Sequence, residues 1–398
     1  MKSNRFDYLE LGDQTEQPLL NQEQEDAPVN LTIPSSPTGD ANQASQRARA
    51  DIAIPGITPV RRKDPPRLAE VRVDETGERF LPPDPASPKP WAVGVTKKLK
   101  PVEVFGSRGD KAGEFNFPTG LAVDKTGIVW VADSYNHRLQ RITPDGGVAS
   151  VGTRGLGRGQ FMMPMDVAVD DQRAFYVVEQ GGHRVQKFSS EGVLELVIGR
   201  SGSRPGEMRS PMGITVNEIT GEILVADTGN SRVQRFDRNG QFAGIFGEGE
   251  LAGPTAVSNP QAIASDADGR VYVADTMARR VLQFDPLGRL LGYYGGPIGP
   301  GQRVGSTSID LNEARSLACT ESGTLFIGDV HRGAGRITAI ATDTGNVDAA
   351  VGSVGKTLGL LSRPGGLAVT PEVFSGSDVR DVYLSDTMNH RIIRFAWR

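Results

Sequence analysis

The stretch VADSYNHRLQRITPDG, residues 131–146, places a carboxylate, an amide, an imidazole and two guanidinium groups close together. Such groups bind metal ions or transfer protons in many enzymes. Asp133, Asn136, His137 and Arg138 are also residue types that occur in turns and in charge pairs beside them. The choice between a reactive site and a turn decides whether the chain is interpreted as an enzyme or as a binding module.

The same stretch recurs along the chain. Copies such as ILVADTGNSRVQRF, from Ile223, and VYLSDTMNHRIIRF, from Val382, keep an acid, a turn and an arginine in the same order. The six acids, spaced 46 to 57 residues apart, are Asp133, Glu179, Asp227, Asp275, Asp329 and Asp386. A position that repeats once per unit is explained more simply by the fold of the unit than by one active centre.

Each unit is predicted to form four short strands. A run such as PTGLAVD precedes the strand that ends in the acid, and a turn and a run such as VASVG follow it. The turns contain Asp-x-x-Gly, Asp-Gly or Asn-Gly, which tolerate the dihedral angles of tight hairpins. Four antiparallel strands in about 48 residues are typical of one propeller blade, and such repeats bury their apolar faces only by stacking on one another.

The two ends of the repeat region predict how the ring closes. The chain stops at IIRFAWR, the third strand of the sixth unit, and the run Val102–Gly106 matches the missing fourth strand. The predicted fold class is therefore all-β: a six-bladed β-propeller closed by an N-terminal outer strand and preceded by a disordered tail. We place the tail at residues 1–100 and the propeller at residues 101–398.

The pattern P-x-G-[LI]-A-V-D followed by V-A-D-x-x-N-H-R-[LIV]-Q-[RK]-[FI] and a glycine resembles the NHL repeat. The resemblance covers roughly residues 102–398 and implies the six-bladed propeller of that family. It also brings alternatives for function. Related six-bladed propellers include metal-dependent lyases and lactonases, and some NHL propellers bind single-stranded RNA.

The acids are expected to cap a turn and to pair with an arginine across the second hairpin of each unit. The arginines are Arg138, Arg184, Arg232, Arg280, Arg336 and Arg391. The fifth unit stretches the acid-to-arginine gap from five residues to seven. A metal site formed by His137, His183 and His390, on the adjacent units 1, 2 and 6, is the alternative interpretation.

An axial metal enzyme needs several ligands that converge from the innermost strands. The residues that enter these strands are mostly small or apolar, with one carboxylate and one arginine, so no enzyme and no cofactor are predicted. The same mouth is the predicted binding site for a protein or peptide, because thioethers beside a guanidinium are adaptable. The alternative interpretation is that the methionines only fill the core. The candidate binding residues are Thr119, Met165, Asp166, Met212, Gln261 and Arg315.

Charge argues against a nucleic-acid partner. The whole chain carries a formal net charge of -4, and the repeat region has 30 Lys and Arg against 33 Asp and Glu, interleaved along the sequence. RNA-binding faces combine a basic stripe with aromatic platforms, and the sequence shows neither. The expected partner is therefore a protein or peptide, bound by a monomeric propeller.

The N-terminal region is rich in Pro, Ser, Gln and charge, which is typical of disorder. FDYLEL, Phe6–Leu11, is a candidate docking motif or a chance cluster, and Trp91 is a candidate docking residue or a packing anchor. The single cysteine, Cys319, excludes an internal disulfide. Without an apolar stretch of signal-peptide or membrane-span length, a cytoplasmic location is expected.

Overall fold

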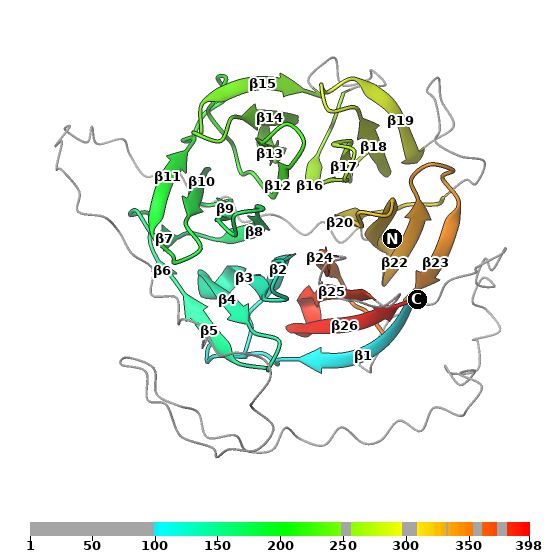
Figure 1. Ribbon diagram of the computed structural model, residues 1–398, viewed down its shortest axis with the longest axis horizontal. Helices are drawn as coiled ribbons and strands as arrows, with labels where there is room; N and C mark the ends of the chain where they lie inside the picture. The colour runs from blue at the N-terminus through cyan, green and yellow to red at the C-terminus, as the bar shows by residue number, and fades with distance from the viewer. Residues whose placement is uncertain (1–98, 248–255, 297–308, 332, 353–359, 372–379) are drawn as a thin grey trace, which may run out of the picture.

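The protein is a closed ring of β-sheets. The computed structural model describes residues 99–247, 256–296, 309–331, 333–352, 360–371 and 380–398. Their strands form six four-stranded antiparallel sheets around a central axis (Figure 1), which confirms the predicted all-β six-bladed propeller. The motif Phe6–Leu11, Trp91 and the predicted disordered tail, except its last two residues, lie outside the described residues.

The strand bounds follow the repeat closely. Blades 1 to 3 contain β2 (Pro118–Val123), β3 (Val129–Asp133), β4 (Arg138–Ile142) and β5 (Val148–Val151); β8 (Pro164–Val169), β9 (Phe175–Glu179), β10 (Arg184–Phe188) and β11 (Leu194–Ile198); and β12 (Gly213–Asn217), β13 (Glu222–Asp227), β14 (Arg232–Phe236) and β15 (Phe242–Phe246). Blades 4 to 6 contain β16 (Pro260–Ser265), β17 (Val271–Asp275), β18 (Arg280–Phe284) and β19 (Leu290–Gly295); β20 (Ala314–Cys319), β21 (Thr324–His331), β22 (Ala334–Ala341) and β23 (Val347–Val351); and β24 (Pro364–Val369), β25 (Arg380–Asp386), β26 (Arg391–Trp397) and β1 (Leu99–Phe105).

Smaller elements complete the described part of the chain. They are the two-residue strands β6 (Thr153–Arg154) and β7 (Gln160–Phe161), and the 3-10 turns η1 (Ser134–Asn136), η2 (Thr228–Asn230) and η3 (Thr387–Asn389). No helix in the described ranges has the length and apolar character needed to cross a membrane.

The N-terminal strand closes the ring. β1 pairs antiparallel with β26, and this places Leu99 opposite Trp397 and Phe105 opposite Ile392. The strand therefore begins three residues before the predicted start at Val102, because Leu99 is buried in the apolar cluster that contains Trp397. It ends at Phe105, one residue early, since Gly106 turns the backbone with a φ of +82°.

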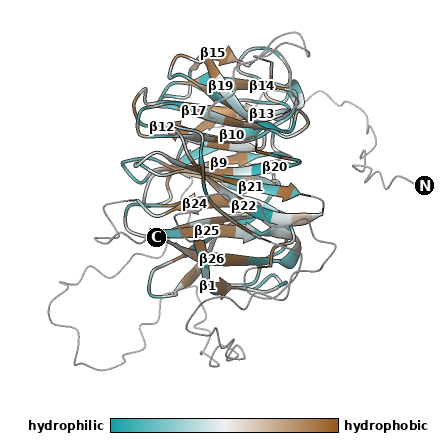
Figure 2. Ribbon diagram, turned by 90° about the vertical axis from the view of Figure 1, so that its right-hand side faces the viewer, coloured by the Kyte–Doolittle hydropathy of each residue, from teal (hydrophilic) through white to brown (hydrophobic). Residues whose placement is uncertain are grey.

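Apolar side chains between neighbouring blades form the core. There are six buried clusters in the described residues, one at each blade interface. Between blades 1 and 2, Trp130 stacks on Phe175 with ring centroids 4.5 Å apart, and Phe175 stacks on Phe188 at 4.9 Å. Second strands such as β3 and β9 are buried along their whole length, and hydrophobic segments recur in the strands in the edge-on view of Figure 2.

The antiparallel order gives the propeller two distinct faces. The innermost strand of every blade starts at what we call the upper face and runs to the lower face. The upper face carries the turns between the second and third strands and the loops that lead from each blade into the next. The lower face carries the turns between the first and second and between the third and fourth strands. The repeated acid and arginine therefore lie at the upper face, at the end of one strand and the start of the next.

Candidate functional site

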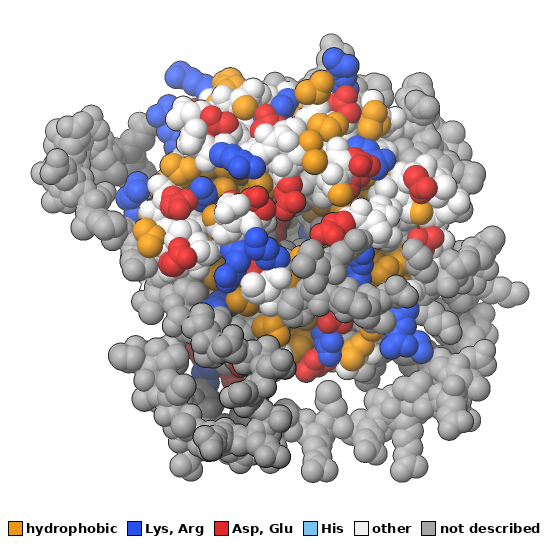
Figure 3. Space-filling view, viewed as in Figure 1, with side chains coloured by type: hydrophobic (Ala, Val, Ile, Leu, Met, Phe, Trp, Pro, Cys, Tyr) orange, Lys and Arg blue, Asp and Glu red, His pale blue; other side chains and the backbone are white. Residues whose placement is uncertain are grey.

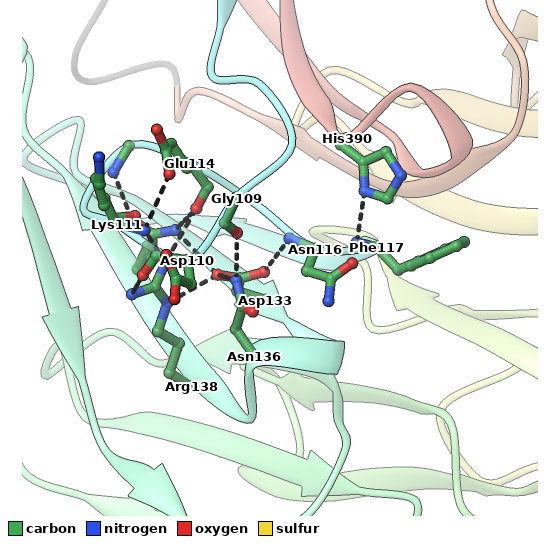
Figure 4. A network of polar contacts seen from close by, with 12 residues as sticks. Gly109, Asp110, Lys111, Glu114, Asn116, Phe117, Asp133, Asn136, Arg138 and His390 are labelled. Carbon is green, nitrogen blue, oxygen red and sulfur yellow. Dashed lines mark hydrogen bonds and ion pairs between the residues drawn. The ribbon is translucent and has the colours of Figure 1, made fainter.

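In blade 1 the motif acid is the centre of a buried hydrogen-bond network (Figure 4). Asp133 is fully buried, and its Oδ1 accepts a hydrogen bond from the backbone N–H of Asn116 at 2.7 Å. Its Oδ2 accepts bonds from Asn136 Nδ2 at 2.9 Å, Arg138 Nε at 2.8 Å and Gln140 Nε2 at 3.0 Å. Because four donors surround this carboxylate, it is held rather than exposed for reaction.

The motif arginine fastens the loop that leads into the blade. The Arg138 guanidinium donates to the backbone carbonyls of Asp110 at 2.6 Å, Lys111 at 2.8 Å and Glu114 at 3.0 Å. Carbonyls in a loop need partners when they are covered, and a charged donor supplies strong ones. The acid thus orients the arginine, and the arginine orients the loop.

All six blades repeat this acid–arginine pair. Glu179 with Arg184, Asp227 with Arg232, Asp275 with Arg280 and Asp386 with Arg391 are ion pairs of 2.7 to 3.2 Å between a fully buried acid and an arginine. In blade 5 the hairpin extends past Asp329, so Arg336 still lies directly opposite the acid and pairs with it. The twelve motif residues therefore form one acid–arginine pair in each blade, and these pairs hold the blades' own strands and loops.

The three candidate metal-binding histidines connect neighbouring blades. His137, His183 and His390 all adopt a left-handed backbone conformation. The Nδ1 atom of each accepts a hydrogen bond from a backbone N–H at the start of the next blade, at Met163 (3.0 Å), Ser210 (2.9 Å) and Phe117 (3.1 Å) respectively.

These bonds fix the chemistry of the imidazoles. Burial and the positive charge of Arg154 lower the pKa of His137, and burial and Arg209 lower that of His183. A neutral ring with an accepting Nδ1 carries its proton on Nε2. Each of the three histidines bonds to a different blade interface, so they do not converge on one site. Within the described ranges no group of three or more His, Cys, Asp or Glu is arranged to hold a metal ion.

The central cavity opens at the upper face and has a volume of about 480 Å³. The innermost strands supply most of its wall. All six candidate binding residues line it: Thr119, Met165, Asp166, Met212, Gln261 and Arg315. Phe117, Tyr135 and Met163, which were not among the predicted binding residues, also line the mouth. Phe117 and Met163 directly precede the proline of an innermost strand, a position that could have been added from the repeat.

Asp166 is the acid that the innermost strands bring into the cavity. Its Oδ1 accepts from the backbone N–H of Val167 at 2.9 Å, and its Oδ2 accepts from Ile214 in the next blade at 3.1 Å. Burial raises the pKa of Asp166 to about 7, although both backbone bonds act in the opposite direction. A Cβ atom at Gly120 would lie 2.0 Å from Asp166 Oδ1, so the neighbouring strand needs glycine there.

The cavity residues do not fit an axial metal ion. Both carboxylate oxygens of Asp166 already accept backbone hydrogen bonds. Arg315 contributes a guanidinium to the same cavity from blade 5, where it donates to Gln261 Oε1 at 2.9 Å and to Glu313 Oε2 at 3.0 Å. A cation site needs several free oxygen or nitrogen donors and gains nothing from a fixed positive charge.

The large apolar side chains of the mouth are concentrated on one half, which we call the apolar half. Blades 1 to 3 contribute Phe117, Tyr135, Met163, Met165 and Met212 there, beside the polar Thr119, Ser134, Asp166 and Gln180. Tyr135 is 55% exposed and its ring centroid lies 4.7 Å from that of Phe117, so this side offers accessible aromatic surface.

The other half, from blades 4 to 6, is polar. Gln261, Arg315 and Arg363 line the cavity there. Asn259 accepts a hydrogen bond from Gln261 Nε2 at 2.7 Å, and Glu313 holds Arg315. The mouth therefore offers an apolar and a polar wall to one ligand.

The upper face of blades 1 to 3 is also basic. The loops that lead into these blades, residues 106–117, 152–163 and 199–212, contain seven cations and three carboxylates. We call the seven cations the basic sector: Arg108, Lys111, Arg154, Arg158, Arg200, Arg204 and Arg209. All seven side chains are exposed. The expectation that no one-signed region exists was therefore wrong for this part of the molecule, because charges that alternate along the chain are sorted by the fold onto different faces.

The lower face of the same blades has the opposite sign. Its six turns contain seven carboxylates and three cations. Burial, and then the negative charges of Asp171 and Glu321, raise the pKa of Glu218. Figure 3 views this face, and acidic side chains gather near its centre. Blades 1 to 3 thus carry a charge difference along the propeller axis.

Comparison with known proteins identifies the repeat. The family model described as the NHL repeat matches residues 115–142 and 208–236. NHL repeat-containing protein 3 of Mus musculus is 32% identical over 92 residues, which is 23% of this chain. The match spans about a quarter (26%) of the length of that relative.

Solved structures share the fold at low sequence identity. A structural genomics protein from Bacteroides thetaiotaomicron has a TM-score of 0.56 at 15% identity, covering 76% of each chain. A gluconolactonase from Xanthomonas campestris has a TM-score of 0.50 at 12% identity, and a streptogramin B lyase has 0.50 at 15%, each covering 76% of this chain and 98% of the other. These similarities show the fold alone. The chain thus contains two segments that match the NHL repeat, and its described residues form a six-bladed β-propeller.

Proposed function

We propose that this protein is a non-catalytic binding scaffold that takes a peptide segment of a protein partner at the upper mouth of its central cavity. The observation that carries the proposal is the two-sided wall of the mouth. A peptide that inserts an aromatic or aliphatic side chain would meet Phe117 and three methionines. Its backbone and polar groups would face Gln261 and Arg315 across the opening.

The size and the material of the mouth support a peptide segment. A volume of about 480 Å³ lies within the range of pockets that bury small ligands, and it accommodates a few side chains rather than a folded domain. Thioethers adapt their shape to different ligands. The acid–arginine networks hold the surrounding loops, and a rigid scaffold with ordered loops loses little entropy when it binds.

The metal-dependent lyase or lactonase remains the alternative from the resemblance. What speaks against it is the donor set of the cavity, where Asp166 accepts two backbone bonds and Arg315 contributes a fixed positive charge from another blade. Elemental analysis of the purified full chain tests this point directly. About one zinc, calcium or iron per chain after gel filtration would overturn the scaffold proposal, and less than ~0.1 per chain would support it.

Peptide binding is tested by selecting random peptides on the full chain and measuring their affinity by fluorescence anisotropy. The double variant Met165→Ala/Met212→Ala should weaken selected peptides at least tenfold, because both thioethers line the apolar wall. Leu287→Ala is the matched control, since Leu287 is 62% exposed on the lower face. A peptide-binding mouth would be refuted if the selected peptides bound Met165→Ala/Met212→Ala as tightly as the natural chain, or if the selection yielded no peptide.

A further inference from the structure

Few of the positive charges in the basic sector are neutralised by nearby carboxylates. Within the described part of the chain, only Arg200 among its seven cations forms an ion pair, with Glu207 at 3.0 Å. In contrast, the motif arginines beneath it are all paired with buried acids. A surface that carries an excess of exposed cations attracts an anionic ligand that neutralises them. The sector lies on the upper face of the same three blades that form the apolar half of the mouth.

A segment with the complementary character occurs in the same chain. Residues 6–26, FDYLELGDQTEQPLLNQEQED, contain seven Asp and Glu and no Lys or Arg. The segment begins with the candidate docking motif Phe6–Leu11, which combines four aromatic and aliphatic residues with two acids. Phe6, Tyr8 and Leu9 suit an apolar wall of methionine and phenylalanine, and the flanking acids suit the arginines around it.

We infer that residues 6–26 bind the upper face of their own propeller, with Phe6–Leu11 at the apolar half of the mouth and the acids on the basic sector. This inference rests on the proposed function, because it names an occupant for the same peptide-binding mouth. The segment acts as an intramolecular competitor, so an external peptide binds only when it displaces the segment.

The length of the chain permits this contact. β1 begins at Leu99 on the lower side of blade 6 and ends at Phe105 on the upper side. A path from Leu99 up the outside of the blade and across to the mouth covers roughly 40 Å, from the rise of a seven-residue strand and the spacing of four strands. An extended chain covers about 3.3 Å per residue, so residues 27–98 are several times longer than needed. Tethering also raises the local concentration of the segment to the millimolar range, about 1 mM for a flexible linker.

The experiment uses a dye-labelled synthetic peptide of residues 6–26 and two forms of the full chain. One is the natural sequence, and the other has its own segment neutralised. The neutralising substitutions are Asp7→Asn, Glu10→Gln, Asp13→Asn and Glu16→Gln. The labelled peptide should bind the neutralised chain at least tenfold more tightly than the natural chain, whose own segment competes. Equal affinity for both chains would overturn the inference, because it would show that the natural segment does not occupy the site.

The location is tested by charge reversal in the neutralised chain. Arg154→Glu/Arg158→Glu should weaken the peptide at least tenfold, and its affinity should fall steeply with salt. Arg238→Glu/Arg289→Glu is the matched control, because both arginines are exposed in turns of the lower face. Thermal melts confirm that each variant folds. Equal losses from the two pairs of substitutions would contradict the assignment to the basic sector.

The outcomes separate this inference from the proposed function. If randomly selected peptides bind in a manner sensitive to Met165→Ala/Met212→Ala and the peptide of residues 6–26 does not bind, the scaffold proposal holds and the intramolecular ligand is refuted. If a single-stranded oligonucleotide binds the neutralised chain and neither kind of peptide does, both proposals fail. The basic sector would then be a nucleic-acid surface.

Discussion

Removing the motif arginine from blade 3 tests whether the acid–arginine network supports the fold. Asp227 is fully buried, and the side chain of Arg232 is 4% exposed. Arg232 Nε donates to Asp227 at 2.9 Å, and its guanidinium donates to the backbone carbonyls of Arg204 and Glu207 at 2.8 and 2.9 Å. Arg232→Met keeps an apolar stem of similar length and removes the guanidinium that makes these three bonds.

The magnitude follows from the burial of the acid that remains. Breaking a buried ion pair by removing one partner costs about 3–5 kcal/mol, because the other charge stays uncompensated. Asn230 and Gln234 still donate to Asp227, each at 2.9 Å, so the cost should fall near the middle of that range, about 4 kcal/mol. For a domain of 150–250 residues this corresponds to a fall in melting temperature of roughly 8–16 °C, and a larger ring is expected at the lower end.

Thermal unfolding monitored by circular dichroism measures this change. Arg200→Met is the control, because Arg200 belongs to the loop that Arg232 binds through Arg204 and Glu207, but its side chain is 77% exposed. The melting temperature of this variant should change little. Asp227→Asn in the Arg232→Met background should recover more than half of the loss, since it removes the unpaired charge. If Arg232→Met costs no more than Arg200→Met, the motif pair does not support the fold and the case for a site at these residues reopens.

Three further predictions concern single positions. Gly120→Ala should lower the melting temperature by several degrees, whereas Gly244→Ala, whose added Cβ meets nothing closer than 3.8 Å, should be nearly neutral. The folded pKa of His137 lies below its unfolded value near 6.5, so its contribution to stability is complete above pH ~6.5 and is lost as pH falls. The unfolding free energy, measured by urea titration, should therefore change less between pH 7.5 and pH 5 in His137→Asn than in the natural chain. Burial raises the pKa of the Cys319 thiol well above its ordinary value, so iodoacetamide at pH 8 should modify the folded chain much more slowly than the urea-unfolded chain. Equal rates in both states would contradict the raised pKa of the thiol.

The fold could be predicted because the repeat carries its information locally. The turn residues, the apolar strands and the recurring acid each occur within one unit, and six units in order leave few alternatives to a ring. The closing strand was also predictable, since the last unit supplies only three of the four strands of its blade. Its start was misplaced because Leu99 joins the core through Trp397, at the far end of the sequence.

The site was predictable only in part, because it depends on contacts between blades. The entry position of each innermost strand identified the cavity residues from Thr119 to Arg315. In contrast, nothing in the sequence near His137 indicates that its Nδ1 accepts a bond from Met163 in the next blade. The basic sector was missed for a related reason. Turns at the upper and lower faces alternate along the chain, so opposite charges that are adjacent in sequence end on opposite sides of the ring.

The pairing of β1 with β26 sets the order of events during synthesis. Glu103 and Arg394, which bond across these strands, are 291 residues apart in sequence. At ribosomal rates of about 5–20 residues per second, β1 waits roughly 15–60 s for its partner. During that time its edge is unpaired, and an unpaired strand edge is a template for pairing with another chain. The last blade is therefore the step at which a nascent chain is most open to capture by chaperones or by a second copy of itself, and shortening the C-terminus by a few residues would prolong that exposure indefinitely.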